Sequence, residues 1–252
     1  MKSNYRTRVY ERYVSAFKAT KGERPDYAFT DSKLLPLLEP WVRSIKRSAP
    51  CVDLGCGNGN LLHALATLGF TDLHGVDFSA EQVALARHVA TEVEIGDARN
   101  YLERHPDGHF HLITVFDVIE HLTRDEILDL VDLVALKLAR GGVFIAHCPN
   151  ADSPMVGQIF AGDLSHETLL NPASAALVCA LAGLENFEAI EHLGASRSWA
   201  GRIRTLFWRT LRCFWLAYNL TETGSAGSGV LTRNFAFKAT AASAPSLRVV
   251  SR

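Results

Sequence analysis

Short apolar runs alternate with amphipathic segments of helical period from residue 51 to residue 150, and this alternation constrains the fold more than any other feature. The apolar runs are CVDLG, DLHGVDF, VEIGDA, HLITVFDV and GGVFIAHCP, and the helical segments include LLHALATLG, EQVALARHVA and RDEILDLVDLVALKLA. Parallel strands need crossover connections, which are usually helices. The pattern therefore predicts an α/β fold with a mostly parallel sheet and helices on both of its faces. The Gly141-Gly142 pair is expected to end the last of these helices.

The composition excludes several classes of protein. The 252 residues are 48% hydrophobic and carry 26 Lys+Arg against 27 Asp+Glu, for a formal net charge of -1. These proportions exclude a disordered or fibrous chain, and the balanced charge argues against nucleic acid as a partner. Five cysteines without a Cys-x-x-Cys pair are typical of a reducing compartment. We see neither a secretory signal nor an apolar run of about 18 residues, and we expect a cytoplasmic protein.

A glycine-rich loop, DLGCGNG at residues 53–59, follows the first apolar run and precedes a helical segment. Glycines at such a place let the backbone turn tightly and approach a ligand closely. A dinucleotide site would have the spacing Gly-x-Gly-x-x-Gly, whereas this loop has Gly-x-Gly-x-Gly followed by Asn60. The loop therefore indicates a nucleotide-type ligand but disfavours NAD.

The segment from Asp53 to Gly59 resembles the first motif of class I S-adenosylmethionine-dependent methyltransferases, and three further motifs follow in the expected order. Asp77 resembles the acid that binds the ribose hydroxyls, Asp97 the acid that contacts the adenine, and Phe116-Asp117 the motif around the methyl donor. Taken singly, each of these acids is equally well explained as a helix cap or turn residue. The cofactor-binding residues that the resemblance implies are Asp53, Gly55, Cys56, Gly57, Gly59, Asp77, Phe78, Asp97, Ala98, Phe116 and Asp117.

This resemblance implies a Rossmann-like fold with a mostly parallel seven-stranded sheet, an antiparallel last strand, and S-adenosylmethionine as cofactor. The sulfonium methyl group is already activated, so the protein must position an acceptor and remove its proton. The candidate catalytic residues at the strand ends and in the segments after them are Asp117, His121, His147 and His166. We favour His166 as the base because it begins a stretch that resembles the family's His-x-x-x-(Phe/Leu)-x-x-Pro-x-(Ser/Ala) pattern. The alternative is that His166 caps the next helix.

The spacing of Asp117, Glu120 and His121 also resembles the Glu-x-x-Glu-His metal cluster of ubiquinone-pathway O-methyltransferases, with Asp in place of the first Glu. The same spacing fits the start of a helix in an adenosine pocket. We expect no metal at this place.

A basic and aromatic segment lies between Glu191 and Glu222, where the chain has five arginines and no acidic residue. Plotted at about 100° per residue, residues 202–218 form an amphipathic helix with arginines on its polar face. The apolar face holds Ile203, Leu206, Phe207, Leu211, Phe214, Ala217 and Tyr218, with Trp208 and Trp215 at one edge near Arg204, and with Arg202, Arg209 and Arg212 opposite. Three interpretations compete: a helix that covers the core, in-plane binding to an anionic membrane surface, and nucleic-acid binding.

We divide the chain into an N-terminal helical lid (1–48), a methyltransferase domain (49–240) with a helical insertion (196–220), and a disordered tail (241–252). The lid includes the aromatic residues Tyr5, Tyr10, Tyr13 and Phe17 and a helix that starts near Asp31 as its N-cap.

The segment RTLFWRTLRCFWLAYN and the TGSAGSGVLTRN that closely follows it resemble the C-terminal part of methyltransferases from bacterial surface-polysaccharide gene clusters. This resemblance implies O-methylation of a sugar in a surface or lipid-linked glycan, at the inner face of the cytoplasmic membrane. Alternatives are a polyprenyl-quinone precursor or another small molecule as acceptor, or a non-catalytic protein that binds the cofactor.

Overall fold

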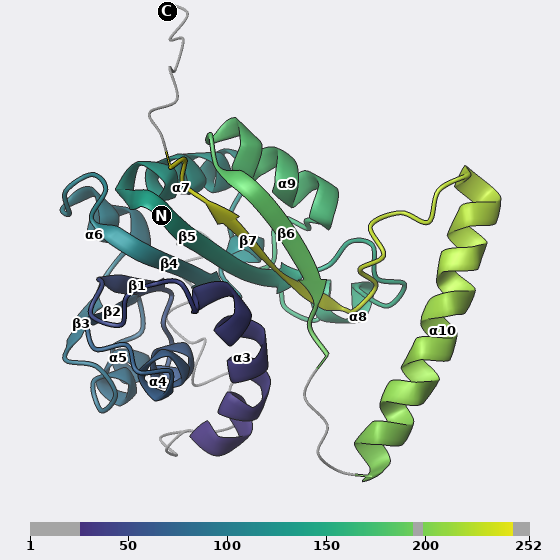
Figure 1. The fold of residues 1–252 in the computed structure, drawn as a ribbon, viewed down its shortest axis with the longest axis horizontal. Coiled ribbons are helices and arrows are strands. Elements are labelled where there is room, and N and C mark those ends of the chain that lie inside the picture. Colours follow the sequence, from purple (N-terminus) through teal and green to yellow (C-terminus); the bar gives the residue numbers. More distant parts are fainter. Residues whose placement is uncertain (1–25, 194–198, 244–252) are drawn as a thin grey trace, which may run out of the picture.

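Seven strands form one sheet in the order β3-β2-β1-β4-β5-β7-β6 in the computed structural model, which describes residues 26–193 and 199–243 (Figure 1). The strands are β1 (Cys51–Leu54), β2 (Leu73–Asp77), β3 (Glu92–Ile95), β4 (Phe110–Phe116), β5 (Leu138–Pro149), β6 (Glu185–Glu191) and β7 (Asn234–Thr240). The first five run parallel, and β7 lies antiparallel between β5 and β6. The predicted sheet, including its antiparallel last strand, is confirmed.

Helices cover both faces of the sheet, and each face has its own hydrophobic core. One face packs against α3 (Tyr27–Val42), α4 (Asn60–Thr67) and α5 (Ala80–Ala86), and the other against α6 (Ala98–Glu103), α7 (Arg124–Lys137) and α9 (Pro172–Leu181). The remaining elements are the 3-10 helix η1 (Ile119–His121), α8 (Gly157–Phe160) and α10 (Trp199–Thr223). Within the described residues, no helix combines the length and apolarity that crossing a membrane requires.

Two expectations about helix ends are wrong. Helix α3 already begins at Tyr27, and Asp31 lies inside it, where its carboxylate contacts Nδ1 of His63 on α4 at 3.2 Å. The Gly141-Gly142 pair does not end a helix, because α7 stops at Lys137 and the pair lies within β5. A Cβ atom at Gly142 would lie 2.8 Å from the carbonyl oxygen of Ala139, so the strand itself requires glycine there.

Helix α3 connects the two halves of the sheet. The Tyr27 hydroxyl donates to the carbonyl oxygen of Asn58 in the glycine loop at 3.5 Å. At the other end of the helix, the Trp41 indole N–H donates to Oε1 of Glu188 on β6 at 3.2 Å. This helix therefore spans from the glycine loop to the far edge of the sheet. The rest of the predicted lid, residues 1–25, lies outside the described residues, as do Arg197 in 194–198 and the tail from 244 to 252.

Helix α10 lies beside the sheet and falls between β6 and β7 in the chain (Figure 1). It contains all of the predicted amphipathic segment 202–218 and extends beyond it at both ends. Arg212 faces the body of the protein, where its guanidinium contacts Oε1 of Glu191 at 3.3 Å and the carbonyl oxygen of Gly229 at 2.7 Å. Trp208 and Trp215 are half-buried along this same inner side.

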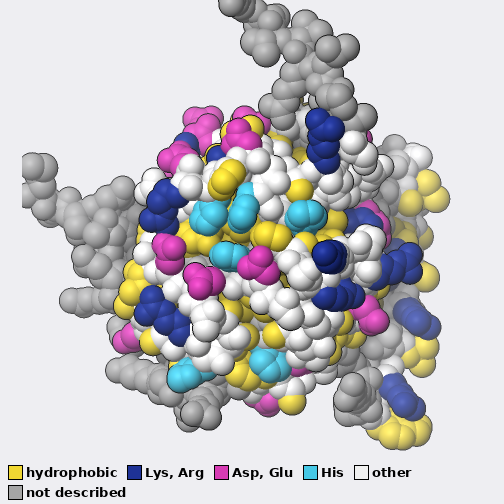
Figure 2. All heavy atoms as spheres, turned by 60° about the vertical axis from the view of Figure 1, so that its left-hand side comes forward, with side chains coloured by type: hydrophobic (Ala, Val, Ile, Leu, Met, Phe, Trp, Pro, Cys, Tyr) yellow, Lys and Arg dark blue, Asp and Glu magenta, His cyan; other side chains and the backbone are white. Residues whose placement is uncertain are grey.

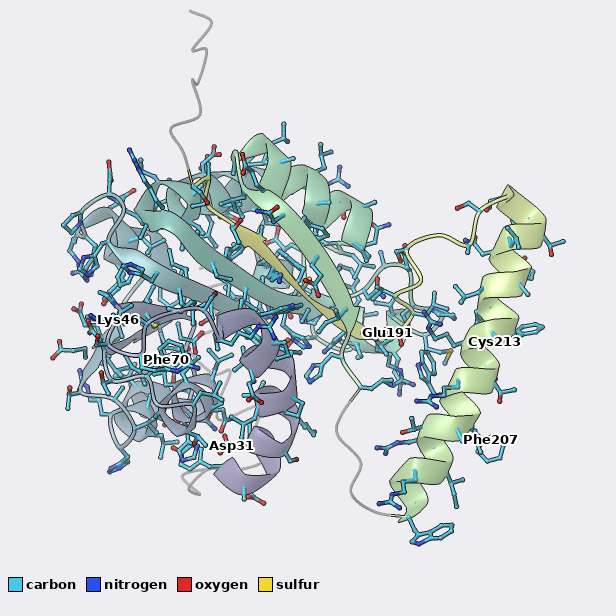
Figure 3. All side chains as sticks on the ribbon, in the orientation of Figure 1. Asp31, Lys46, Phe70, Glu191, Phe207 and Cys213 are labelled. Carbon is cyan, nitrogen blue, oxygen red and sulfur yellow. The ribbon has the colours of Figure 1, made fainter. Side chains whose placement is uncertain are left out.

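The apolar face of α10 consequently points away from the core. Phe207 and Phe214 are 67% and 60% exposed, and Figure 3 shows Phe207 on the side of the helix opposite the sheet. The interpretation of α10 as a helix that covers the core is therefore wrong. The side of α10 that faces the protein carries Arg212, paired with Glu191, and the half-buried Trp208 and Trp215. Phe207 and Phe214 lie on the opposite side of the helix and therefore do not pack into the core.

Candidate functional site

The glycine loop after β1 requires glycine for both backbone and steric reasons. Gly55, Gly57 and Gly59 have φ angles of +76°, +52° and +85°, a region that residues with a Cβ atom rarely adopt. A Cβ at Gly59 would also lie 2.9 Å from the Cα of Ala86, whereas one at Gly57 would meet only Oε1 of Gln82, at 3.7 Å. The loop is thus packed closely against α5 on one side and open at Gly57.

Asp77 fixes the loop to the end of the neighbouring strand β2. Its Oδ2 accepts the N–H of Gly57 at 2.9 Å, and its Oδ1 accepts the N–H of Ser79 at 2.8 Å. A carboxylate offers about four lone-pair positions, so Asp77 keeps acceptor capacity for a ligand. Phe78, the next residue, is exposed.

Asp53 and Cys56 lie beneath the loop, within the core. Asp53 is 2% exposed and its Oδ1 accepts the Thr114 hydroxyl at 2.7 Å. Burial, with a smaller contribution from Asp77, raises the pKa of the Asp53 carboxyl to about 7. Burial likewise raises the pKa of the Cys56 thiol. These two residues support the loop from below and do not line its open side.

Asp97 is the N-cap of α6, since its Oδ1 accepts the N–H of Asn100 at 2.9 Å, and Ala98 is the first residue of that helix. The cap interpretation of Asp97 is thus correct, and its position at the end of β3 is compatible with a ligand role as well.

Two buried acceptors beside the loop have no hydrogen-bond partner among the described residues: Oδ1 of Asn60 and Oε1 of Gln82. Buried polar atoms in native proteins are almost always paired, so these two suit the donor groups of a ligand. Gln82 was missed at the sequence level because it lies in an ordinary helical segment.

Asp117, His147 and His192 form a hydrogen-bonded row across the carboxyl ends of β4, β5 and β6. Nδ1 of His147 lies 2.7 Å from Oδ1 of Asp117, and Nδ1 of His192 lies 2.7 Å from Nε2 of His147. Asp117 adopts a φ of +54°, which is rare outside glycine, and its N–H donates to the His147 carbonyl oxygen at 3.0 Å. Loss of solvation would by itself raise the pKa of the Asp117 carboxyl. The charge and hydrogen bond of the neighbouring His147 instead hold this pKa below its ordinary value.

The ring of Phe116 stacks on that of His147, with centroids 5.4 Å apart. Burial, then the neighbouring His147, lowers the pKa of His192 to about 4. Sequence reasoning missed His192, because nothing in the EAIEHL segment marks it as different from a residue at the end of a strand.

Glu120, His121 and His166 form a second group, with ligand-type atoms within 4.8 Å of one another. Oε2 of the buried Glu120 has no hydrogen-bond partner among the described residues, and burial raises the pKa of its carboxyl well above the ordinary value. Burial lowers the pKa of His121, whose Nδ1 lies 2.9 Å from the Ser165 hydroxyl. This donor set has the chemistry to hold a divalent ion. It includes His166 in place of Asp117, so the grouping differs from the predicted one.

The four predicted catalytic residues are therefore divided between two groups, Asp117 with His147 and His121 with His166. Figure 2 views the molecule from the side on which β3, α5 and α6 lie in Figure 1, and other histidine and acidic side chains gather on that face. Nδ1 of His166 lies 3.1 Å from the carbonyl oxygen of Phe160, which leaves its Nε2 as the nitrogen that can act on a substrate.

Solved structures show the same fold at low sequence identity. The chain resembles an S-adenosylmethionine-dependent methyltransferase from Archaeoglobus fulgidus, with a TM-score of 0.62 and 17% identity over 92% of this chain and 99% of the other. It also resembles a possible histamine N-methyltransferase from Thermotoga maritima, with a TM-score of 0.56 and 14% identity over 93% of this chain and 95% of the other. A third similar structure is the phosphoethanolamine N-methyltransferase 2 of Haemonchus contortus, with a TM-score of 0.56 and 16% identity over 83% of this chain and 52% of the other.

Comparison with curated protein sequences gives no match. The family model described as a methyltransferase domain matches residues 24–215, which is most of the chain and includes the glycine loop and both histidine groups. The chain therefore belongs to the methyltransferase domain family, and it carries the fold of S-adenosylmethionine-dependent methyltransferases.

Proposed function

We propose that this protein transfers the methyl group of S-adenosylmethionine to a hydroxyl oxygen of a sugar, in a surface glycan or lipid-linked glycan held close to a membrane. The observation that carries the membrane-proximal acceptor is the outward apolar face of α10. The sugar acceptor is supported by the resemblance of residues 204–219 and 223–234 to methyltransferases of surface-polysaccharide gene clusters. S-adenosylmethionine is the cofactor, and it supplies an activated methyl group.

The residues at the loop fit this cofactor. Gly57 leaves the backbone open to close approach, and Asp77 at the end of β2 would accept the ribose hydroxyls. Asp97 and Ala98 at the end of β3 would contact the adenine. Phe116 and Asp117, at the end of β4, would line the methionine part. The unpaired buried acceptors Asn60 and Gln82 support a bound ligand with donor groups on this side of the loop.

The histidines near Asp117 suit a hydroxyl acceptor, because methylation of oxygen releases a proton that a base must take. His121, His147 and His166 all lie in the two groups beside the end of β4. The sequence favours His166 among them.

Helix α10 supports a membrane-proximal acceptor through its side chains. Its outward face presents Trp199, Ile203, Leu206, Phe207, Phe214 and Tyr218, all more than 45% exposed. At about 100° per residue, Arg202 and Arg209 lie along one side of this face and Arg204 along the other. All three arginines are exposed. Apolar side chains between flanking arginines suit a helix that lies in the plane of an anionic membrane surface.

The test is a methyl-transfer assay with radiolabelled S-adenosylmethionine and fractionated cell-envelope lipids and glycans. We expect label in a glycan-bearing fraction, and loss of that label after glycosidic cleavage of the sugars from the lipid. At a cofactor concentration below the wild-type Kd, the Asp77→Ala variant should transfer at least about tenfold less label than the wild type, while Asp129→Ala, an exposed change on α7, should behave like the wild type.

Label in a quinone-precursor fraction would replace the proposed acceptor with a small molecule. A protein that binds S-adenosylhomocysteine in calorimetry but transfers label to no fraction would support the non-catalytic alternative.

A further inference from the structure

The row of Asp117, His147 and His192 connects three strands at one edge of the sheet. Strands β5 and β6 are both antiparallel to β7, so they run in the same direction, and their carboxyl ends lie on the same side as that of β4. His192 directly follows β6, and its side chain reaches back to His147 over a separation of 45 residues in the chain. The contact therefore joins the outer edge of the sheet to the strand end beside the glycine loop.

Simple hydrogen-bond chemistry assigns a direction to this row. Asp117 has a lowered pKa and is ionised at neutral pH, so it accepts a proton from Nδ1 of His147. Because the Nδ1 proton of His147 is directed to Asp117, its Nε2 is the nitrogen that accepts the N–H of His192 Nδ1. By the same reasoning, neutral His192 carries its own lone pair on Nε2.

That last nitrogen is buried and has no hydrogen-bond partner among the described residues. The charged and titratable groups that act on His192 are His147 on β5, Asp117 after β4, and Lys33 on α3. None of these groups forms a hydrogen bond with Nε2 of His192. A buried lone pair without a donor is uncommon in folded proteins, and it leaves Nε2 of His192 able to accept a donor from outside the described residues.

The geometry points to His192 as the catalytic residue that takes the proton of the acceptor hydroxyl, with His147 and Asp117 as positioning residues that hold it in the required tautomer. This assignment rests on the proposed function. The acceptor oxygen attacks the methyl carbon, the carbon–sulfur bond breaks, and its electron pair stays on sulfur. The hydroxyl proton moves to Nε2 of His192, which becomes an imidazolium and later releases the proton to water.

A base of low pKa is adequate for this step. Burial and then His147 lower the pKa of His192 to about 4, so its ring is neutral with its lone pair available at pH 7. The acidity of a hydroxyl rises steeply as its oxygen bonds to carbon, because positive charge develops on the oxygen. The negative charge of Asp117, two hydrogen bonds away, then stabilises the imidazolium.

The position of His192 also fits an acceptor presented from the membrane side. Glu191, the preceding residue, is the one that holds Arg212 of α10, and Figure 3 shows it at the end of the sheet nearest that helix. The backbone N–H of His192 donates to the Thr232 hydroxyl at 3.3 Å, which fixes the chain at this point. His192 is therefore the member of the row nearest in the chain to the contact with α10.

The His192→Asn variant tests the assignment. The Asn amide can donate to His147 as Nδ1 does, but it places no lone pair at the position of Nε2. In the assay with the envelope fraction that the wild type labels, we expect kcat to fall by about 10²- to 10⁴-fold. The affinity for S-adenosylhomocysteine, measured by calorimetry, should not change. His111→Asn, an exposed histidine at the opposite end of β4, is the matched control and should keep the wild-type rate.

A second measurement tests the positioning role. The ¹⁵N chemical shifts of the histidine rings report which nitrogen of His192 carries the proton, and we expect Nδ1–H in the wild type at pH 7. The His147→Phe variant keeps an aromatic ring against Phe116 but removes the acceptor, so it should yield a mixture of His192 tautomers. A residue with only a packing role would leave this tautomer unchanged.

The outcomes separate this inference from the proposed function. A wild-type rate in His192→Asn, or a loss of rate in His166→Ala alone, would overturn the assignment while leaving methyl transfer intact. A wild type that labels no fraction contradicts the proposed function. In that case the ring spectra still decide, because His192 protonated on Nε2 in the wild type would refute the row as described.

Discussion

The guanidinium of Arg212 on α10 lies 3.3 Å from the carboxylate of Glu191 at the end of β6, on the side of the helix opposite its exposed aromatic residues. The ion pair is partly exposed and is worth little free energy by itself. It marks the side of α10 that faces the protein body, which also carries the half-buried Trp208 and Trp215.

The first prediction concerns membrane binding. Phe207→Glu with Phe214→Glu should reduce co-sedimentation with vesicles that contain anionic lipid by about tenfold or more, because the outward face loses apolar area and gains negative charge. Arg209→Glu should reduce it by a smaller factor. The control is Leu177→Glu on α9, which removes an equally exposed apolar side chain elsewhere. Equal sedimentation of all variants and the wild type would exclude α10 as a membrane contact.

A second prediction concerns the glycine loop. Gly59→Ala should lower the free energy of unfolding by about 1–3 kcal/mol, because the residue has a positive φ and a Cβ would press on the backbone of Ala86. Gly157→Ala is the matched control, since a Cβ there meets no atom within 4 Å and the φ is not positive. Chemical denaturation measures both variants. If the two curves coincide, the loop does not need glycine at residue 59.

A third prediction follows from the buried Asp53. Its pKa is about 4 in an unfolded chain and about 7 in the folded protein, so folding disfavours its ionised form. The destabilisation is absent below pH 4, grows as the pH rises from 4 to 7, and is complete above 7. Asp53→Asn removes it. The stability of the variant relative to the wild type should therefore be higher at pH 8 than at pH 5, by roughly 2–3 kcal/mol.

Denaturant unfolding at the two pH values measures this difference. Asp132→Asn, at another exposed carboxyl on α7, is the control. Parallel behaviour of Asp53→Asn and the wild type between pH 5 and pH 8 would mean that Asp53 ionises in the folded protein as easily as in water.

A fourth prediction concerns the cofactor. Asp77→Ala removes the acceptor for the N–H of Gly57 and the carboxylate proposed for the ribose hydroxyls, so it should weaken S-adenosylhomocysteine binding about 10- to 100-fold. Asp77→Asn should have an intermediate effect, because an amide oxygen accepts one of these bonds but lacks the charge. Titration calorimetry provides the measurement, and unchanged affinity in both variants would remove Asp77 from the binding site.

Much of the fold could be predicted from local pattern alone. Short apolar runs predict strands, and apolar residues at a period of about 3.6 predict helices, so the alternation of the two could be recognised in the sequence. The three glycines within residues 55–59 predict a tight turn that approaches a ligand. The start of α3 was misplaced, because Asp31 has the residue type of an N-cap although tertiary contact with His63 explains it. Gly141 and Gly142 were misread for a similar reason, since a β-strand and a helix end both accept glycine.

By itself, the sequence determined the order of the strands and helices, the glycine loop with its acids, and the presence of an amphipathic helix between β6 and β7. The tertiary structure alone decided which face of that helix is exposed, because a helical period defines two faces but not the one that contacts the body. It also decided that His192 joins His147 and Asp117, since only strand pairing brings residues 45 positions apart within hydrogen-bond distance. Local pattern records periodicity and residue type, whereas proximity between distant residues is a property of the folded chain.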